Sequence, residues 1–288
     1  MAILFPIDLT NRIEIPKNKN PIIADNIEAS KPNRGAILSP IKAPARIMSF
    51  REKFQAMRQL GVDRLLRIRF NEELRGMSAQ RFVEDVFVAG LGVRYVVLGD
   101  DFRFGNDRQG DVRFIQQQGE IHGYAAGPTP TQEWQGDRVS STRIRQALEA
   151  ADFDRAEKML GRPYTISGKV IYGRQLGQTI GTPTANLELR RLRAPLAGVY
   201  AVEVSGAGLD RALGVANVGV RPTVDDSIKA NLEVHLLDRN IELYGQHIEV
   251  CFRHKLRDEK KFDSVDELKL NIASDIENTR AWFAQRRA

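Results

Sequence analysis

The stretch GRQLGQTIGTPTAN, residues 173–186, is the most informative part of this 288-residue chain. Glycines recur in it at every fourth position, at Gly173, Gly177 and Gly181. Glycine lets the main chain approach a ligand closely, and Pro183 fixes the backbone directly before Thr184. The hydroxyl of Thr184 and the side-chain oxygen of Asn186 are hard ligands, the kind that suit Mg²⁺ beside substrate phosphates. We therefore expect a flexible loop over phosphate groups beside a magnesium-binding pair; the alternative is a glycine-rich surface turn before a strand.

Two other glycine motifs are excluded by the residues of this loop. A G-x-x-x-G contact between membrane helices requires an apolar segment, whereas Arg174, Gln175 and Gln178 are polar. A Walker A loop ends in Gly-Lys-Ser or Gly-Lys-Thr, and the stretch contains neither.

The composition indicates a globular chain of two domains. It is 42% hydrophobic, which is enough for real cores, and no run approaches the roughly 18 apolar residues of a membrane helix. Met1–Ile7 is a poor signal peptide because it lacks a basic segment, and the single cysteine, Cys251, excludes an internal disulfide. We therefore expect a cytoplasmic protein without a membrane partner.

The charge of the chain favours small anions over nucleic acid as partners. The net charge is +6 and the isoelectric point is about 9.5. The 43 basic residues are spread among 37 acidic ones rather than clustered, so a nucleic-acid partner is not indicated. A positive field also favours anionic small molecules such as ATP.

We expect three segments along the chain. Residues 1–42 contain five prolines and loop-like stretches, so we expect irregular packing there. Residues 43–160 alternate helices and strands, which is typical of a parallel sheet covered by helices. Residues 161–288 consist of short strands separated by turns, as in a small antiparallel barrel, and they end in a helix with a capping box at Ser264 and Glu267.

The expected elements follow from local patterns. Helices are expected after Ser49, whose capping box includes Glu52, after Ser78 and Asp111, and over 152–160. Strands are expected over 65–70 and 95–98, and then over 164–171, 199–204, 213–218, 231–237 and 247–252.

Two stretches of the α/β region are candidate ligand sites. GDDFRFG, residues 99–105, follows the strand over 95–98, and ligands bind outside the carboxyl ends of strands in such sheets. SSTRIR, residues 140–145, begins a helix, where hydroxyls cap free N–H groups and nearby arginines favour phosphate. The alternatives are an ordinary turn and a capped helix with exposed arginines.

Glu233 is the candidate general base of the barrel region. Strand alternation over 231–238 puts it with His235 on one face, opposite the apolar face of Leu232 and Val234. A carboxylate amid an apolar strand is expected to have a raised pKa, which suits a base; the alternative is an exposed glutamate on an edge strand. We interpret His235 as structural, since the histidines lack the spacing of a zinc site.

From about Ala43 to its end, the chain resembles the bacterial bifunctional riboflavin kinase/FAD synthetase family. For the barrel, the resemblance implies phosphorylation of riboflavin to FMN by ATP, with Thr184 and Asn186 holding Mg²⁺ and the ATP phosphates. The loop of Gly173, Gly177 and Gly181 would cover the phosphates. Glu233 would take the proton of the ribityl 5′-hydroxyl as that oxygen attacks the γ-phosphate.

Two further barrel segments match motifs of this family. Residues 217–223 resemble its N-x-G-x-x-P-T turn, which shapes the nucleotide and flavin pockets and includes Asn217. Residues 257–262 match its R-D-E-x-x-F segment near the flavin, so Arg257 is the expected contact of the flavin phosphate.

The α/β region resembles the FMN adenylyltransferase half of the family, which has a nucleotidylyl-transferase fold. The resemblance assigns Asp101 and Phe102 to the flavin and nucleotide cleft, and Ser141, Thr142 and Arg145 to the ATP phosphates. The sequence departs from the family in lacking its early Gly-x-Phe-Asp-Gly-x-His-x-Gly-His loop, because no histidine precedes His122. Those histidines stabilise the charge that develops on the phosphates. We therefore expect an incomplete domain that makes little or no FAD; the alternative for the whole chain is a flavin- or nucleotide-binding protein without turnover.

Overall fold

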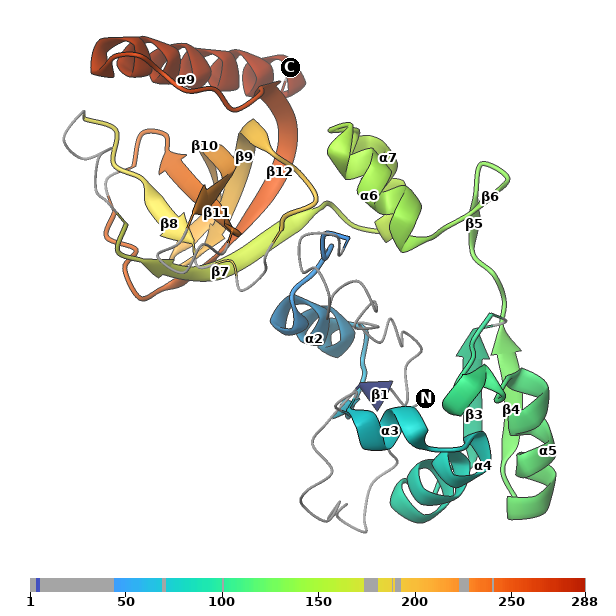
Figure 1. Ribbon diagram of the computed structural model, residues 1–288. Helices are drawn as coiled ribbons and strands as arrows, with labels where there is room; N and C mark the ends of the chain where they lie inside the picture. Colours follow the sequence, from blue (N-terminus) through green and yellow to red (C-terminus); the bar gives the residue numbers. More distant parts are fainter. Residues whose placement is uncertain are drawn as a thin grey trace. The chain divides into compact units, whose positions relative to one another are not determined.

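The computed structural model describes residues 4–5, 44–68, 71–99, 101–173, 181–187, 189, 193–222, 228–239 and 241–287 (Figure 1). The chain divides into two compact units. The first unit takes Met1–Ala43 and Lys53–Glu133, and the second, which we call the barrel unit, takes Pro44–Glu52 and Trp134–Ala288. Helix α2 (Phe50–Gln59) crosses from one to the other, and none of the described helices is both long and apolar enough to cross a membrane.

The first unit is an α/β arrangement with short parallel strand pairs. Strand β1 (Leu4–Phe5) pairs with β2 (Leu66–Arg67), and β3 (Tyr95–Gly99) pairs with β4 (Ala125–Thr129). The helices are α3 (Glu72–Gly76), α4 (Ala79–Phe82), the π-helix Val83–Gly90, the 3₁₀ turn Asn106–Arg108 and α5 (Val112–His122). As expected, Ser78 and Asp111 cap α4 and α5, through hydrogen bonds from backbone N–H groups to Ser78 Oγ (3.1 Å) and Asp111 Oδ1 (2.8 Å).

The barrel unit contains a closed barrel of antiparallel neighbours in the order β10-β11-β8-β7-β12-β9. The strands are β7 (Thr165–Ile171), β8 (Ala185–Leu187), β9 (Gly198–Gly206), β10 (Leu209–Pro222), β11 (Ile228–Leu236) and β12 (His247–Arg257). Five of them lie where the apolar alternation predicted strands. The sixth, β8, was not among the predicted strands, because it has only three residues and begins inside the glycine-rich stretch, at Ala185.

Two helices that precede the barrel in sequence share its core. The short hairpin β5 (Glu133–Trp134) and β6 (Asp137–Arg138) leads into α6 (Ser141–Glu149) and α7 (Phe153–Leu160). Phe153 of α7 is 7% exposed, and its ring lies 5.8 Å from that of Tyr200 and 6.3 Å from that of Phe252. Contacts therefore group residues 134–160 with the barrel, whereas the sequence pattern suggests a boundary at 161.

The first turn of α2 and the segment before it are also attached to the barrel. Glu52, which is 7% exposed, forms the predicted capping box with Ser49 and also accepts a hydrogen bond from the backbone N–H of Ser167 on β7 (2.8 Å). The hydroxyl of Tyr164 donates to the carbonyl of Ile47 (3.1 Å). A residue predicted only as a helix cap therefore also satisfies a backbone donor of the barrel.

Helix α9 (Val265–Arg287) lies along the barrel at the end of the chain (Figure 1). Ser264 caps this helix as predicted, because the N–H of Glu267 donates to Ser264 Oγ (3.1 Å), while the Glu267 carboxylate accepts from the N–H of Asp263 (3.1 Å). Ile276 packs against Val199, Val215 and Leu237 on the outside of the barrel. This side of the helix is therefore used for packing within the unit.

Candidate active site on the barrel

Three polar residues lie in register across neighbouring strands of the barrel. Glu233 on β11 is directly opposite Asn186 on β8, and on its other side it is directly opposite Asn217 on β10. Residues opposite one another on antiparallel strands point to the same face. Their neighbours Leu187, Ala216, Val218, Leu232 and Val234 are in the buried core, so the polar row lies on the outer face of the barrel.

The predicted magnesium-binding pair lies at one end of this row. Asn186 is 6% exposed, and a Cβ atom added at Gly173 would lie 2.3 Å from its Nδ2, so only glycine leaves room for this amide. Thr184 lies two residues earlier and is half-buried. Gly181 has a φ of +81°, which favours glycine, whereas Gly177 lies outside the described residues.

Two side chains support the row from β11. Asn231 Nδ2 donates to Glu233 Oε1 (2.8 Å), which restricts the orientation of the carboxylate. His235 Nδ1 lies 2.9 Å from the carbonyl oxygen of Pro183 and so ties β11 to the residues before Asn186. This contact agrees with the structural interpretation of His235. The support from Asn231 was not predicted, although its position two residues from Glu233 on the same strand face could have suggested it.

The other end of the row meets the segment that follows β12. Asn217 Nδ2 lies 3.5 Å from Glu259 Oε1. A Cβ atom at Gly219 would lie 2.3 Å from the same oxygen, so glycine at 219 is what allows this carboxylate to lie against β10. Thr223, the last residue of the predicted turn, lies outside the described residues.

Arg257 joins the barrel to α9. Its Nε and Nη2 atoms donate to the carboxylate of Asp275, at 3.0 and 2.8 Å, and its Nη1 donates to the carbonyl of Asp258 (3.1 Å). Asp275 is 4% exposed, so this is a largely buried, two-pronged ion pair. The flavin-phosphate contact stays a prediction, and the structure gives Arg257 a packing role besides.

The predicted residues of the adenylyltransferase half fall in both units. In the first unit, Asp101 is exposed just after β3, while Phe102 is 9% exposed and its ring stacks on Phe104 at 5.6 Å. In the barrel unit, Ser141 and Thr142 form the first turn of α6, and Arg145 Nε donates to the carbonyl of Ala45 (2.7 Å). Their roles in binding nucleotide stay predictions.

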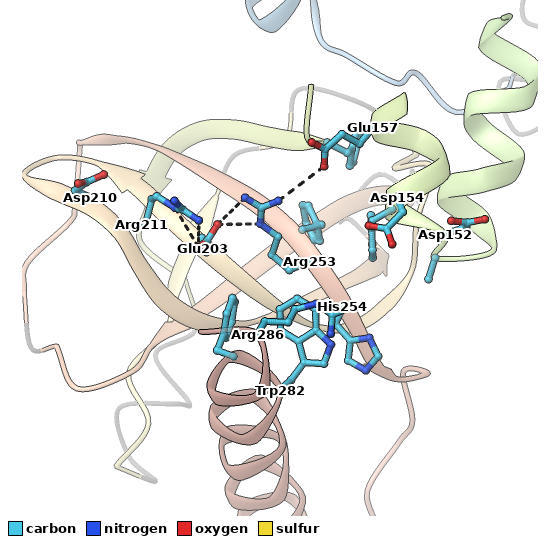
Figure 2. Close-up of a pocket in the computed structure, with 15 residues that line it drawn as sticks. Asp152, Asp154, Glu157, Glu203, Asp210, Arg211, Arg253, His254, Trp282 and Arg286 are labelled. Carbon is cyan, nitrogen blue, oxygen red and sulfur yellow. Dashed lines mark hydrogen bonds and ion pairs between the residues drawn. The ribbon is translucent and has the colours of Figure 1, made fainter. Parts of the chain in front are cut away.

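A cavity of about 630 Å³ lies elsewhere in the barrel unit, among α7, strands β9, β10 and β12, and the end of α9 (Figure 2). None of the predicted site residues that the structure describes lines it. Three of its charged groups are paired with one another: Arg211 donates to Glu203 Oε1 (2.8 Å) and Arg253 to Glu203 Oε2 (2.8 Å) (Figure 2). Burial works against the charged form of Glu203, but the arginines outweigh it and lower the pKa of this carboxyl.

The aromatic wall of the cavity is also occupied. The ring of His254 stacks on Trp282 at 5.3 Å, and the guanidinium of Arg286 lies 4.2 Å from the centre of the same ring. Because Glu203, its two arginines and Trp282 have partners, we interpret the cavity as part of the packing between helices and barrel. The row around Glu233 is the stronger candidate for chemistry, since it combines a carboxylate with amide and hydroxyl groups.

Comparison with known proteins shows the family of the chain. The family model described as riboflavin kinase matches residues 160–283, and the one described as FAD synthetase matches residues 29–143. A bifunctional riboflavin kinase/FMN adenylyltransferase of Pseudomonas fluorescens is 47% identical over 254 residues, which is 88% of this chain and 81% of that protein. The chain belongs to the bifunctional riboflavin kinase/FMN adenylyltransferase family.

The chain is similar to two further proteins over most of its length. The protein of the same description from Escherichia coli K12 is 48% identical over 242 residues, 84% of this chain and 77% of its own length. A crystal structure from Streptococcus pneumoniae, described as a macrolide-efflux protein, is 32% identical with a TM-score of 0.67, and covers 82% of this chain and 76% of its own. The resemblance inferred from the motifs is therefore confirmed. The FAD synthetase match begins at residue 29, inside the segment where we expected irregular packing.

Proposed function

We propose that the barrel unit transfers the γ-phosphate of ATP to riboflavin and so makes FMN. The observation that carries this proposal is the register of β8, β11 and β10, which sets Glu233 between Asn186 and Asn217 on one face. A base, a candidate metal ligand and a neutral hydrogen-bonding group within one row match the needs of phosphoryl transfer, which depends mostly on positioning and charge neutralisation.

In the proposed reaction, Glu233 accepts the proton of the ribityl 5′-hydroxyl. The hydroxyl oxygen forms a bond to the γ-phosphorus, the bond from that phosphorus to the bridging oxygen breaks, and ADP leaves. Asn231 keeps the carboxylate in place through its hydrogen bond to Oε1. The base therefore needs no large movement before it accepts the proton.

The residues at the Asn186 end of the row fit a magnesium ion. Thr184 and Asn186 offer hydroxyl and amide oxygens, and Gly173 leaves a cradle beside Asn186 that a Cβ atom would fill. Bound there, Mg²⁺ would neutralise charge on the ATP phosphates. Thr184 and Asn186 would thereby fix the position of the phosphates relative to Glu233.

A direct assay separates this proposal from a binding protein without turnover. Purified full-length protein is given riboflavin, ATP and Mg²⁺, and FMN is measured by chromatography. We expect FMN from the wild type and a loss of at least about 100-fold with Glu233→Gln, in line with general-base catalysis. Glu242→Gln, at an exposed glutamate just after β11, is the matched control and should keep full activity. Riboflavin binding without FMN formation would instead support the binding protein.

We propose that adenylylation of FMN to FAD is weak or absent in this chain. The support is that no histidine precedes His122, so the histidine loop that stabilises charge in this transfer is missing. FMN and ATP at high concentration test the idea, and robust FAD formation would contradict it. A cytoplasmic location, like the absence of a nucleic-acid partner, stays a prediction.

A further inference from the structure

The side-chain oxygen of Asn217 is a buried acceptor without a hydrogen-bond partner in the part of the chain that the structure describes. A buried polar atom left unsatisfied is unfavourable, and at a functional site such an atom often receives a ligand group. Asn217 is opposite Glu233, and opposed side chains on neighbouring strands have Cβ atoms about 4.5–5.5 Å apart. The site therefore presents two acceptor groups side by side.

Glu259 determines which end of the Asn217 amide is turned away from it. An ionised carboxylate only accepts hydrogen bonds, so it favours the amide nitrogen of Asn217, which lies 3.5 Å from Glu259 Oε1. Turning the amide over would bring two acceptors together. Gly219 is required for this arrangement, because a Cβ atom there would lie 2.3 Å from the same carboxylate oxygen.

We propose that the site selects a vicinal polyol, and that it binds a second hydroxyl next to the one that is phosphorylated. Glu233 accepts the proton of the reacting hydroxyl, and Asn217 Oδ1 accepts a hydrogen bond from the adjacent one. Glu259 is a positioning residue that keeps the amide in the required orientation. This inference rests on the proposed kinase function, and it adds that a flavin with a simple terminal alcohol is a poor substrate.

The expected selectivity follows from the cost of leaving a buried acceptor unpaired. A site built to bind a hydroxyl rejects the analogue that lacks it, because its own polar group is then left without a partner. For one neutral group, a preference of about 10-fold to 100-fold in kcat/KM is expected.

The experiment compares riboflavin with 4′-deoxyriboflavin, which lacks only the hydroxyl next to the terminal one, as substrates of the full-length protein. We expect the wild type to prefer riboflavin by about 10-fold to 100-fold. Asn217→Leu removes the acceptor, so the ratio of kcat/KM for riboflavin to that for 4′-deoxyriboflavin should fall close to one. Glu259→Gln should reduce it, since a glutamine can accept or donate and no longer orients the amide. Glu242→Gln should keep the wild-type preference.

Two results would overturn the inference. One is equal kcat/KM for the two flavins in the wild type, and the other is an Asn217→Leu protein that loses activity equally on both. Circular dichroism shows whether each variant is folded. If the Asn217→Leu protein does not fold, Glu259→Gln still tests the inference independently. If no flavin is phosphorylated, the kinase proposal fails; the ratio of the two dissociation constants, measured by quenching of flavin fluorescence, still tests the second hydroxyl.

Discussion

Replacing Phe153 by alanine should destabilise the barrel although this residue precedes the barrel strands in sequence. Its side chain is 7% exposed and contacts Tyr200 and Phe252 in the barrel core. Truncating a buried phenylalanine costs about 3–5 kcal/mol. Against a total stability of about 5–15 kcal/mol for a domain, this is a large fraction.

Urea denaturation followed by tryptophan fluorescence measures this effect selectively. The two tryptophans of the chain, Trp134 and Trp282, both lie in the barrel unit. With a denaturant slope of about 2 kcal/mol per molar, the midpoint should fall by about 2 M. FMN formation should be lost at a correspondingly lower urea concentration.

Phe82→Ala is the matched control. Phe82 is 5% exposed in the core of the first unit, where its ring lies 5.4 Å from those of Phe87 and Phe104. Its truncation should leave the tryptophan-detected midpoint nearly unchanged. If both variants shift that midpoint equally, or if Phe153→Ala does not shift it, then α7 is not part of the barrel core and the boundary lies at residue 161.

Three further predictions concern charged groups of the barrel unit. Glu203→Leu leaves two arginines without their carboxylate and should lower the free energy of unfolding, measured by urea denaturation, by about 2–3 kcal/mol. This is less than for a fully buried pair because the side chain of Arg211 is 67% exposed. An unchanged denaturation midpoint would contradict this pairing. Burial, and then Arg286, lower the pKa of His254 from 6.5, so its neutral form is favoured in the folded state. The stability that it contributes should be complete above pH 6.5 and fall as the pH drops below that value, and His254→Phe should flatten this part of a plot of melting temperature against pH. Arg257→Lys keeps the charge but loses the two-pronged contact with Asp275, so we expect a loss of about 1–2 kcal/mol; a specific rise in the dissociation constant for FMN would add support for the flavin-phosphate contact.

Local patterns in the sequence predicted the helix caps, most of the barrel strands and the family. Ser49 and Ser264 each accept a hydrogen bond from the backbone N–H of the glutamate three residues later, so neighbours along the chain are sufficient to form these caps. The alternation around Glu233 likewise determines which face of its strand is polar.

The remaining features depend on contacts between residues far apart in the chain. The pairing of Asn186 with Glu233 depends on the register of β8 and β11, because a shift of one residue would turn every side chain of the shifted strand to the opposite face. The approach of Glu259 to Asn217, 42 positions earlier, depends on where the chain leaves β12 and on the space at Gly219. The packing of α7 into the barrel core likewise follows from tertiary contacts. An amphipathic pattern shows that one face of a helix is buried, but it does not show which element that face packs against.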